Sequence, residues 1–388
     1  MDVSLFIARK LRFRGRIATV SIAVSFLIMI IAVAISSGFR HEIRNGISYL
    51  SGDIQLTSSD MNWTGESSPI ERHPSYFDRL MAIPGVTGIE PYVYRAGILK
   101  AGDNIHGVML KGTAADSTLS GLGISVPVRM ASYLGLAEGD DVLIYFVGDK
   151  VKVRKFNIRS LYDSIIDSDD NLLIYASIDD LQRVNGWGRD SVSALEISLA
   201  SSCRSVGEIA DASMEAGTVA LAFAGENEAS VIASSSIDRY PQLYDWLNLI
   251  DSNVFFILVL MTIVAGFNMI SGLLIMLFEN IPMIGTLKSL GMKDRTIARI
   301  FLRASSSLVL KGMAAGNLLA LAFCGLQSAT HVLKLDPENY FVSFVPVHID
   351  LAGIIAADII SYAVIMILLL VPALFISGVD PAKTMRVG

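Results

Sequence analysis

Three polar side chains interrupt long apolar runs of this sequence, and their setting is the one best suited to chemistry. Asn268, Lys311 and Asp358 each stand among aliphatic and aromatic neighbours. A lone charge in hydrocarbon costs several kcal/mol, so such residues are usually paired or functional. Lys311 and Asp358 lie at similar depths from opposite ends of their runs, which permits an ion pair, and snorkelling of each to its own interface is the open alternative. Asn268 is placed either for a hydrogen bond to a neighbouring helix or for plain packing.

Patterns typical of catalysis or metal binding are missing from the rest of the sequence. The phosphate-binding pattern G-x-x-x-x-G-K-[ST] is absent, as are H-E-x-x-H and G-x-S-x-G, and the five histidines are scattered. The acidic run at Asp163, Asp167, Asp169 and Asp170 lacks the spacing of a metal-binding loop and predicts a solvated loop. We therefore predict no catalytic residue, no metal site and no cofactor in this chain.

The elements that must position the three polar residues are membrane-spanning helices. The chain has 388 residues, of which 52% are hydrophobic and 18% charged, and this is too apolar for an ordinary soluble domain. Each of four apolar runs is long enough for the roughly 20 residues that about 30 Å of hydrocarbon requires. These runs predict transmembrane helices at 17–38, 253–278, 304–327 and 351–376.

Residues 39–252 are rich in Asp, Ser and Gly, and they predict a large α+β domain inserted between the first and second spans. The helix of the first span is expected to continue from Phe39 to Tyr49 and to end at Gly52. Further helices are expected at 76–82, 178–185, 204–216 and 235–250. Alternating patterns predict strands at 53–57, 83–93, 105–113, 171–177, 194–200 and 218–224. Residues 128–158 predict a helix and two strands joined at Gly148–Asp149.

Basic residues near the spans predict the orientation of the chain. They precede the first span, fill the loop 279–303 and follow the fourth span, whereas the loop 328–350 is mostly acidic. Both termini, including the tail 377–388, are therefore expected in the cytoplasm and the large domain in the periplasm. Residues 1–16 fit either an amphipathic helix on the cytoplasmic leaflet or a plain basic flank. The first span also fits a cleaved signal loosely, but three further spans favour its retention.

The loop 279–303 contains a short amphipathic element. Residues 279–290 predict a helix that Gly291 ends in a left-handed C-cap conformation, and Asp294 is expected to cap the helix of the third span. A helix with one apolar side needs a surface to dock on, and the residues alone leave open whether this surface is lipid or a protein groove. The apolar side carries Met283, Ile284, Leu287 and Leu290.

The order of these features, together with several local matches, resembles the permeases of the mechanotransmission class of ABC transporters. Within this FtsX/MacB-like class, the sequence is most similar to the lipoprotein-releasing permeases of the LolC/LolE type. The matching segments are "SLFIARKLRFRGR", "SSGFRHEI", "IPGVTGIEPYV", "GVMLKGTAAD", "RMASYLGLAEGDDVLIY", "AGFNMISGLLIMLFEN", "ENIPMIGTLKSLGMKDRTIARIF" and "LVPALFISGVDPAKTMR". They cover nearly the whole chain, and residues 39–252 correspond to a MacB-like periplasmic core.

The resemblance implies a permease subunit that works with a separate ABC ATPase dimer, which binds ATP and Mg²⁺, and with a second permease subunit, identical or not. It implies an inner-membrane location, a lipoprotein substrate, surrounding lipids and a periplasmic carrier as recipient. The helix in 279–303 would be a coupling helix seated on the ATPase, with coupling residues Glu279, Met283, Ile284, Leu287, Lys288, Leu290 and Gly291. A lipid-facing vestibule between two permease subunits would be lined by Val24, Ile28, Phe256, Leu260, Val264 and Phe267.

Two departures from the family pattern affect these expectations. Met283 occupies a position where the family usually has Glu, which removes one charged contact to the ATPase. Phe146–Lys152 predicts a tight hairpin where the carrier-binding subunit of the family has an extended hook. Lipoprotein release is therefore the function we predict, with two alternatives served by the same mechanics. These are efflux of hydrophobic compounds and regulation of periplasmic cell-wall hydrolases.

Overall fold

The computed structural model describes residues 16–59, 68–102, 104–148, 151–163, 173–226, 228–336 and 340–373. The chain forms two compact units. Unit 1 comprises Met1–His41, Trp246–Lys334 and Phe344–Gly388, and unit 2 comprises Glu42–Asp245 and Leu335–Ser343. Residues 1–15 of the expected N-terminal helix, the tail 377–388, the acidic residues Asp167, Asp169 and Asp170 and the hairpin residue Asp149 lie outside the described residues.

Unit 1 is built from long apolar helices. Four helices among the described residues are long and apolar enough to cross a membrane, which is the number expected. The last of them ends in the short helix α13 (Leu370–Ala373). The four are α2 (Arg16–Ser51), α8 (Pro241–Glu279), α10 (Asp294–Thr330) and α12 (Leu351–Leu368). Helices α2 and α8 extend beyond the expected spans and contribute residues to both units.

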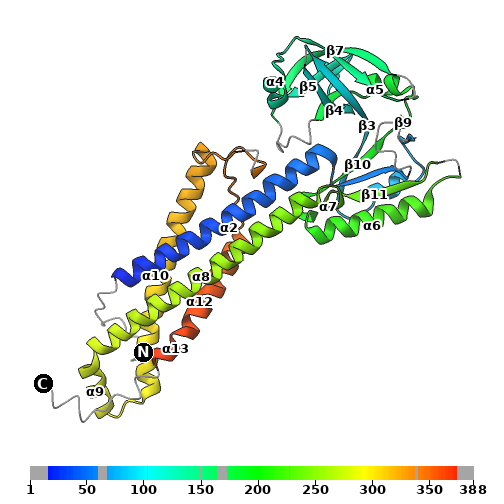
Figure 1. Cartoon of the computed structure of the whole chain (residues 1–388). Helices are drawn as coiled ribbons and strands as arrows, with labels where there is room; N and C mark the ends of the chain where they lie inside the picture. The colour runs from blue at the N-terminus through cyan, green and yellow to red at the C-terminus, as the bar shows by residue number, and fades with distance from the viewer. Residues whose placement is uncertain are drawn as a thin grey trace. The chain divides into compact units, whose positions relative to one another are not determined.

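The core of unit 1 forms where one face of each long helix packs against the others. Phe26 of α2, Met269 of α8, Phe301 of α10 and Ile365 of α12 belong to one buried cluster. The short helix α9 (Ile281–Ser289), which connects α8 to α10, adds Ile284 to the same cluster (Figure 1).

Unit 2 is an α+β domain built around one large sheet. Among the described residues this sheet has nine strands in the order β11-β1-β10-β3-β4-β8-β5-β7-β6, and β3 also pairs with β6. Strands β3, β4, β8, β5, β7 and β6 therefore close into a barrel (Figure 1). Closure requires a long shared strand, and β3 runs over 16 residues from Val86 to Ala101.

The other strands of the sheet are shorter than β3. They are β1 (Ile54–Ser58), β4 (Asn104–Thr113), β5 (Gly123–Pro127), β6 (Asp141–Phe146), β7 (Lys152–Tyr162), β8 (Leu173–Ser177), β10 (Ala194–Leu199) and β11 (Val231–Ser235). A separate pair consists of β2 (Ile70–Glu71) and β9 (Ser191–Val192). The helices are α3 (Phe77–Met81), α4 (Val128–Leu134), α5 (Ile178–Asn185), α6 (Val206–Phe223) and α7 (Ser236–Arg239), with 3₁₀ turns η1 (Ser117–Leu119) and η2 (Ser201–Cys203).

Several local predictions in unit 2 are confirmed. Helix α5 has the expected bounds, and Gly52 follows α2 with a φ of 66°. Strands β6 and β7 pair directly with Phe146 opposite Lys152, so the expected hairpin without a long hook is present. The register of β6 and β7 is continuous along this hairpin.

The predicted strand at 218–224 is wrong, because α6 continues to Phe223. A capping box starts this helix: the Glu208 N–H donates to Ser205 Oγ, and the Ser205 N–H donates to the Glu208 carboxylate. Its buried positions Ala212, Ala216 and Ala220 recur every four residues, which is a helical and not a strand period. Four short strands, β2, β5, β9 and β11, were not predicted.

Candidate functional site

Helix α9 is short and sharply bounded, as its sequence predicts. Pro282 lies in the first turn, where its missing N–H costs no hydrogen bond. At the other end Gly291 has a φ of 84°, and its N–H bonds to Lys288 O at 2.9 Å. The N–H of Met292 bonds to Leu287 O at 3.0 Å. These two bonds form the Schellman motif, so the glycine C-cap prediction is confirmed.

The apolar side of α9 packs against the rest of unit 1, which corrects the expectation that it needs a partner to cover it. Ile284 is fully buried, and Met283 and Leu287 are partly buried against the same cluster. A buried side chain cannot contact another protein directly. Leu290, at the C-cap of α9, is instead 78% exposed, and Gly291 and Glu279, the last residue of α8, are also exposed. These three are the most accessible of the predicted coupling residues.

Lys288 and Asp294 form an ion pair with a distance of 3.0 Å between Nζ and Oδ1. The predicted cap of the third span is therefore wrong: Lys293 occupies the N-cap position of α10 and makes no side-chain capping bond. Asp294 is the first residue of the helix, and its carboxylate faces the lysine of α9. This pair links α9 to α10 across the Gly291 turn.

The six residues expected to line a vestibule all lie on exposed faces of unit 1. Their exposed fractions run from 37% at Ile28 to 68% at Phe256. On α8 the opposite face carries buried Ala265 and Met269, and on α2 it carries buried Ile22 and Phe26. We define the exposed apolar set as Val24, Ile28, Phe256, Leu260, Val264 and Phe267.

Two of the three intramembrane polar residues make hydrogen bonds between helices. Asn268 Nδ2 of α8 donates to Ser21 Oγ of α2 at 2.5 Å. Asn317 Nδ2 of α10 donates to Asp358 Oδ2 of α12 at 2.5 Å. Lys311 is exposed, and among the described residues no ion pair joins it to Asp358. Asn317 lies six residues further along α10, about 9 Å at 1.5 Å per residue, which is why Asp358 meets it instead of Lys311.

A glycine pair on α10 was missed by the sequence reasoning, although "GMAAG" at 312–316 is a G-x-x-x-G pattern. A Cβ built on Gly316 would lie 2.5 Å from Ala23 O of α2. A Cβ on Gly312 would lie 2.7 Å from the Ile22 side chain. Helices α2 and α10 therefore approach closely because neither glycine has a side chain.

Gly316→Ala is expected to destabilise unit 1 by about 1–3 kcal/mol, because its methyl group must push α2 and α10 apart. Gly325→Ala, on the same helix, is the matched control, since a Cβ at this position meets nothing within 4 Å. Thermal unfolding of the full chain in detergent measures both variants. Equal midpoints for the two would contradict the close packing at Gly316.

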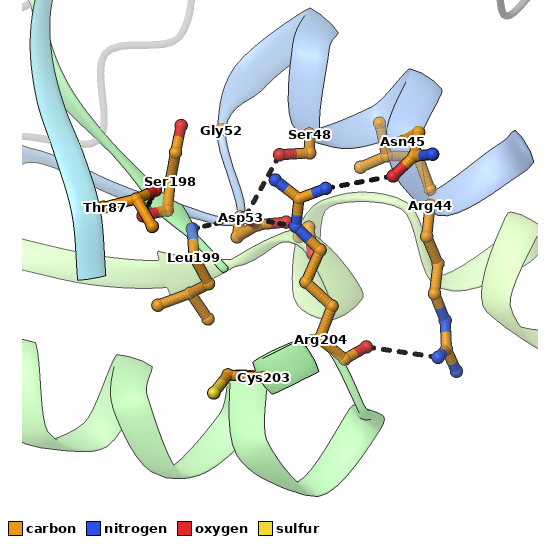
Figure 2. Close-up of polar contacts among 12 residues, drawn as sticks. Arg44, Asn45, Ser48, Gly52, Asp53, Thr87, Ser198, Leu199, Cys203 and Arg204 are labelled. Carbon is orange, nitrogen blue, oxygen red and sulfur yellow. Dashed lines mark hydrogen bonds and ion pairs between the residues drawn. The ribbon is translucent and has the colours of Figure 1, made fainter. Parts of the chain in front are cut away.

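The C-terminal turns of α2 within unit 2 are held by a network around Asp53 (Figure 2). Its Oδ2 accepts hydrogen bonds from Leu199 N at 2.7 Å, Ser48 Oγ at 3.1 Å and Arg204 Nε at 3.1 Å. Arg204 Nη1 donates in turn to Asn45 Oδ1 at 3.0 Å. One buried carboxylate thus joins α2, the end of β10 and the segment before α6.

A second buried network meets the carbonyl end of α2. Lys111 Nζ lies 2.8 Å from Glu196 Oε2 and donates to Leu50 O at 2.7 Å. Arg239 Nη2 donates to Ser51 O at 2.8 Å. Two cations therefore satisfy carbonyl groups at the negative end of the helix dipole. Tyr94 also donates to Glu196.

Burial governs the electrostatics of this second network. It lowers the pKa of Lys111 and raises the pKa of Glu196, and the charge of each partner opposes the shift of the other. Burial and the Glu196 carboxylate raise the pKa of Tyr94 well above its usual value. The tyrosine therefore remains a neutral hydrogen-bond donor.

Comparison with known families supports a permease. The family model described as FtsX-like permease C-terminal matches residues 255–381. The chain is 19% identical over 408 residues to the lipoprotein-releasing system transmembrane protein LolC of Xylella fastidiosa, covering 96% of this chain and 94% of that protein. It is 21% identical over 404 residues to the corresponding LolE protein of Haemophilus influenzae, with the same coverage.

Among solved structures, the periplasmic region of MacB from Actinobacillus actinomycetemcomitans is similar to 52% of this chain. That similarity covers 95% of the MacB region at 12% identity, with a TM-score of 0.32. The extracellular domain of the ABC-type transporter YknZ covers 47% of this chain at 12% identity, with a TM-score of 0.30.

Proposed function

We propose that this chain, an ABC transporter permease with an FtsX-like C-terminal region and similarity to LolC and LolE, releases lipoproteins from a bacterial inner membrane. A separate ATPase subunit supplies the energy, and the released lipoprotein passes to a periplasmic acceptor. Both termini and the α9 segment lie in the cytoplasm in this proposal, where an ATPase can reach them.

The observation that carries the proposal is the short helix α9 between two membrane-crossing helices. Its inner side is fastened to unit 1 by Ile284 and by the ion pair between Lys288 and Asp294. A movement of α9 is therefore transmitted to α8 and α10, because no flexible loop separates it from them. Leu290 supplies an exposed apolar contact at the C-terminal end of α9. Glu279, the last residue of α8, supplies a charge before the other end of α9.

The exposed apolar set supports a lipophilic cargo. Large apolar side chains of α2 and α8 stay exposed within one chain, so lipid, a second permease or an acyl chain can cover them. Regulation of cell-wall hydrolases needs no such surface for cargo. The direct β6–β7 hairpin supports the pairing of this chain with a second permease that holds the carrier, since it has no long hook of its own.

Leu290→Asp is expected to weaken ATPase binding and to reduce ATP-driven release by roughly tenfold or more, as loss of a central apolar anchor does at other interfaces. The chain is purified in mild detergent with its ATPase subunits and reconstituted with a lipid-modified protein. Release after ATP addition is then measured.

The matched control is Leu221→Asp, which makes the same change at an exposed leucine of α6 in unit 2. Normal release by Leu290→Asp, or wild-type chain that purifies without any ATPase subunit, would contradict the coupling role of α9. ATP-driven export of a small hydrophobic compound without lipoprotein release would replace the proposed cargo by the efflux alternative.

A further inference from the structure

The side chains of Asn317 and Asp358 form an incompletely bonded pair between two membrane-crossing helices of unit 1. Asn317 Nδ2 donates to Asp358 Oδ2 at 2.5 Å. The other oxygen of each group, Asn317 Oδ1 and Asp358 Oδ1, is buried and has no hydrogen-bond partner among the described residues. Both unpartnered atoms therefore belong to the two side chains that already share one bond.

An ionised Asp358 cannot account for this arrangement. An ionised carboxylate only accepts hydrogen bonds, as does an amide oxygen, so both buried oxygens would lack a donor. A buried acceptor without a donor is unfavourable, and a bare carboxylate in an apolar segment is more so. One added proton gives both oxygens a bonding role, because the oxygen that carries it becomes a donor and the other oxygen accepts from it.

Among the described residues, no ion pair brings a positive charge to Asp358. One turn away on either helix, Ala320 of α10 and Ile354 of α12 form an apolar cluster with Ile30 of α2. The titratable groups nearest along α10 and α12 are Lys311, which is exposed, and Tyr362, which shares a hydrogen bond with Ser306. On α2 and α8, the hydrogen-bonded side chains of Ser21, Ser25, Thr262 and Asn268 do not titrate. The charged groups Arg40 of α2 and Asp251 of α8 form an ion pair with each other.

We propose that Asp358 and Asn317 form a proton-binding site that holds α10 against α12. A hydronium ion of the solvent gives its proton to Asp358 Oδ1 and becomes water, so one O–H bond breaks as the new one forms. The new O–H group then donates a hydrogen bond to Asn317 Oδ1. With the existing bond from Nδ2 to Oδ2, this closes a ring of two hydrogen bonds between an acid and an amide. The terminal torsions of Asp and Asn are soft, so the second pair of atoms turns to face each other at little cost.

Loss of the proton removes one of the two bonds and leaves a charge against Ile354 and Ala320. The contact between α10 and α12 is therefore tied to occupation of this site. A permease can use such a site to couple helix movement to the uptake or release of one proton.

Infrared spectroscopy of the full chain in lipid nanodiscs at neutral pH tests the site directly. We expect the C=O stretching band of a protonated carboxyl group, which shifts in D₂O and disappears in Asp358→Asn. The matched control is Asp350→Asn on the same helix, where the carboxylate caps α12 by accepting from Ala352 N; it should leave the band unchanged. Absence of the band from the wild-type chain would overturn the proposal.

A second pair of variants keeps the test independent of folding. Asp358→Asn can form the same ring between two amides, so we expect a thermal midpoint equal to that of the wild type. Asn317→Leu removes the acceptor of the proton, and we expect the acid band to move to higher frequency. An unmoved band would overturn the ring, and a wild-type chain stabilised by Na⁺ without any acid band would make this a cation site instead.

Discussion

Replacing Lys111 by Met is expected to lower the free energy of unfolding of unit 2 by about 3–5 kcal/mol, because it leaves Glu196 as an unpaired buried charge. The two side chains are 1% and 5% exposed and lie 2.8 Å apart. The variant also removes the hydrogen bond from Lys111 Nζ to Leu50 O. Replacing Glu196 by Gln at the same time removes the charge while keeping an acceptor for Tyr94, so most of the loss should be recovered.

The free energy of unfolding lost in Lys111→Met should depend on pH, and the burial of Glu196 determines the direction of this dependence. Burial raises the pKa of this carboxyl group in the folded chain, and removal of the lysine takes away the charge that opposed the shift. A folded-state pKa above the unfolded one means that the folded chain binds the proton more tightly. The defect should therefore grow at neutral pH and shrink as the pH falls towards the ordinary glutamate value of about 4.3.

Hydrogen exchange of peptides from β4 and β10 in the full chain measures these changes locally. Lys155→Met is the matched control, because its ion pair with Asp141 at 2.9 Å is on the surface and its side chain is 65% exposed. It should change the free energy by at most about 1 kcal/mol. If the double variant Lys111→Met, Glu196→Gln lost as much free energy of unfolding as the two single variants together, the pairing of Lys111 with Glu196 would be contradicted.

Local sequence patterns predicted the elements of this chain whose signals are themselves local. The four membrane-crossing helices follow from uninterrupted apolar runs, and the ends of α2 and α9 follow from Gly52 and Gly291, whose positive φ suits glycine. The strand expected at 218–224 failed because a run of small and branched apolar residues fits a buried helix as well as a strand. The α6 capping box and its four-residue alanine spacing were the available signals.

Contacts between residues distant in the chain were beyond such patterns. Lys111 and Glu196 are 85 positions apart, and Asp53 and Arg204 are 151 positions apart. A single sequence carries no signal that joins them, and a lysine or glutamate in a strand reads as a solvent-facing residue. The site residues were predictable in kind but not in partner: Asp358 was identified as an unusual intramembrane charge, yet its partner depends on the register between α10 and α12.

Asp53→Ala is the second substitution with a large expected effect, because one oxygen of this carboxylate accepts three hydrogen bonds in the interior of unit 2. The variant leaves the Leu199 N–H buried without its acceptor and Arg204 without its counter-charge. Breaking a buried pair on one side costs about 3–5 kcal/mol. Asp53→Asn keeps an acceptor oxygen and loses only the charge, so we expect a smaller cost of about 1.5–3 kcal/mol.

The location of the loss distinguishes this role from a general effect on folding. Asp53 bonds to Ser48 in the last turns of α2 and to Leu199 at the end of β10 (Figure 2), so both segments should exchange faster in Asp53→Ala than in the wild type. Ser48→Ala is the matched control, since it removes one donor and leaves the ion pair with Arg204 in place; it should cost about 1 kcal/mol. If α2 residues 42–51 keep wild-type protection in Asp53→Ala, then this carboxylate does not fasten the helix to unit 2. The cations at its carbonyl end, Lys111 and Arg239, would then carry that task alone.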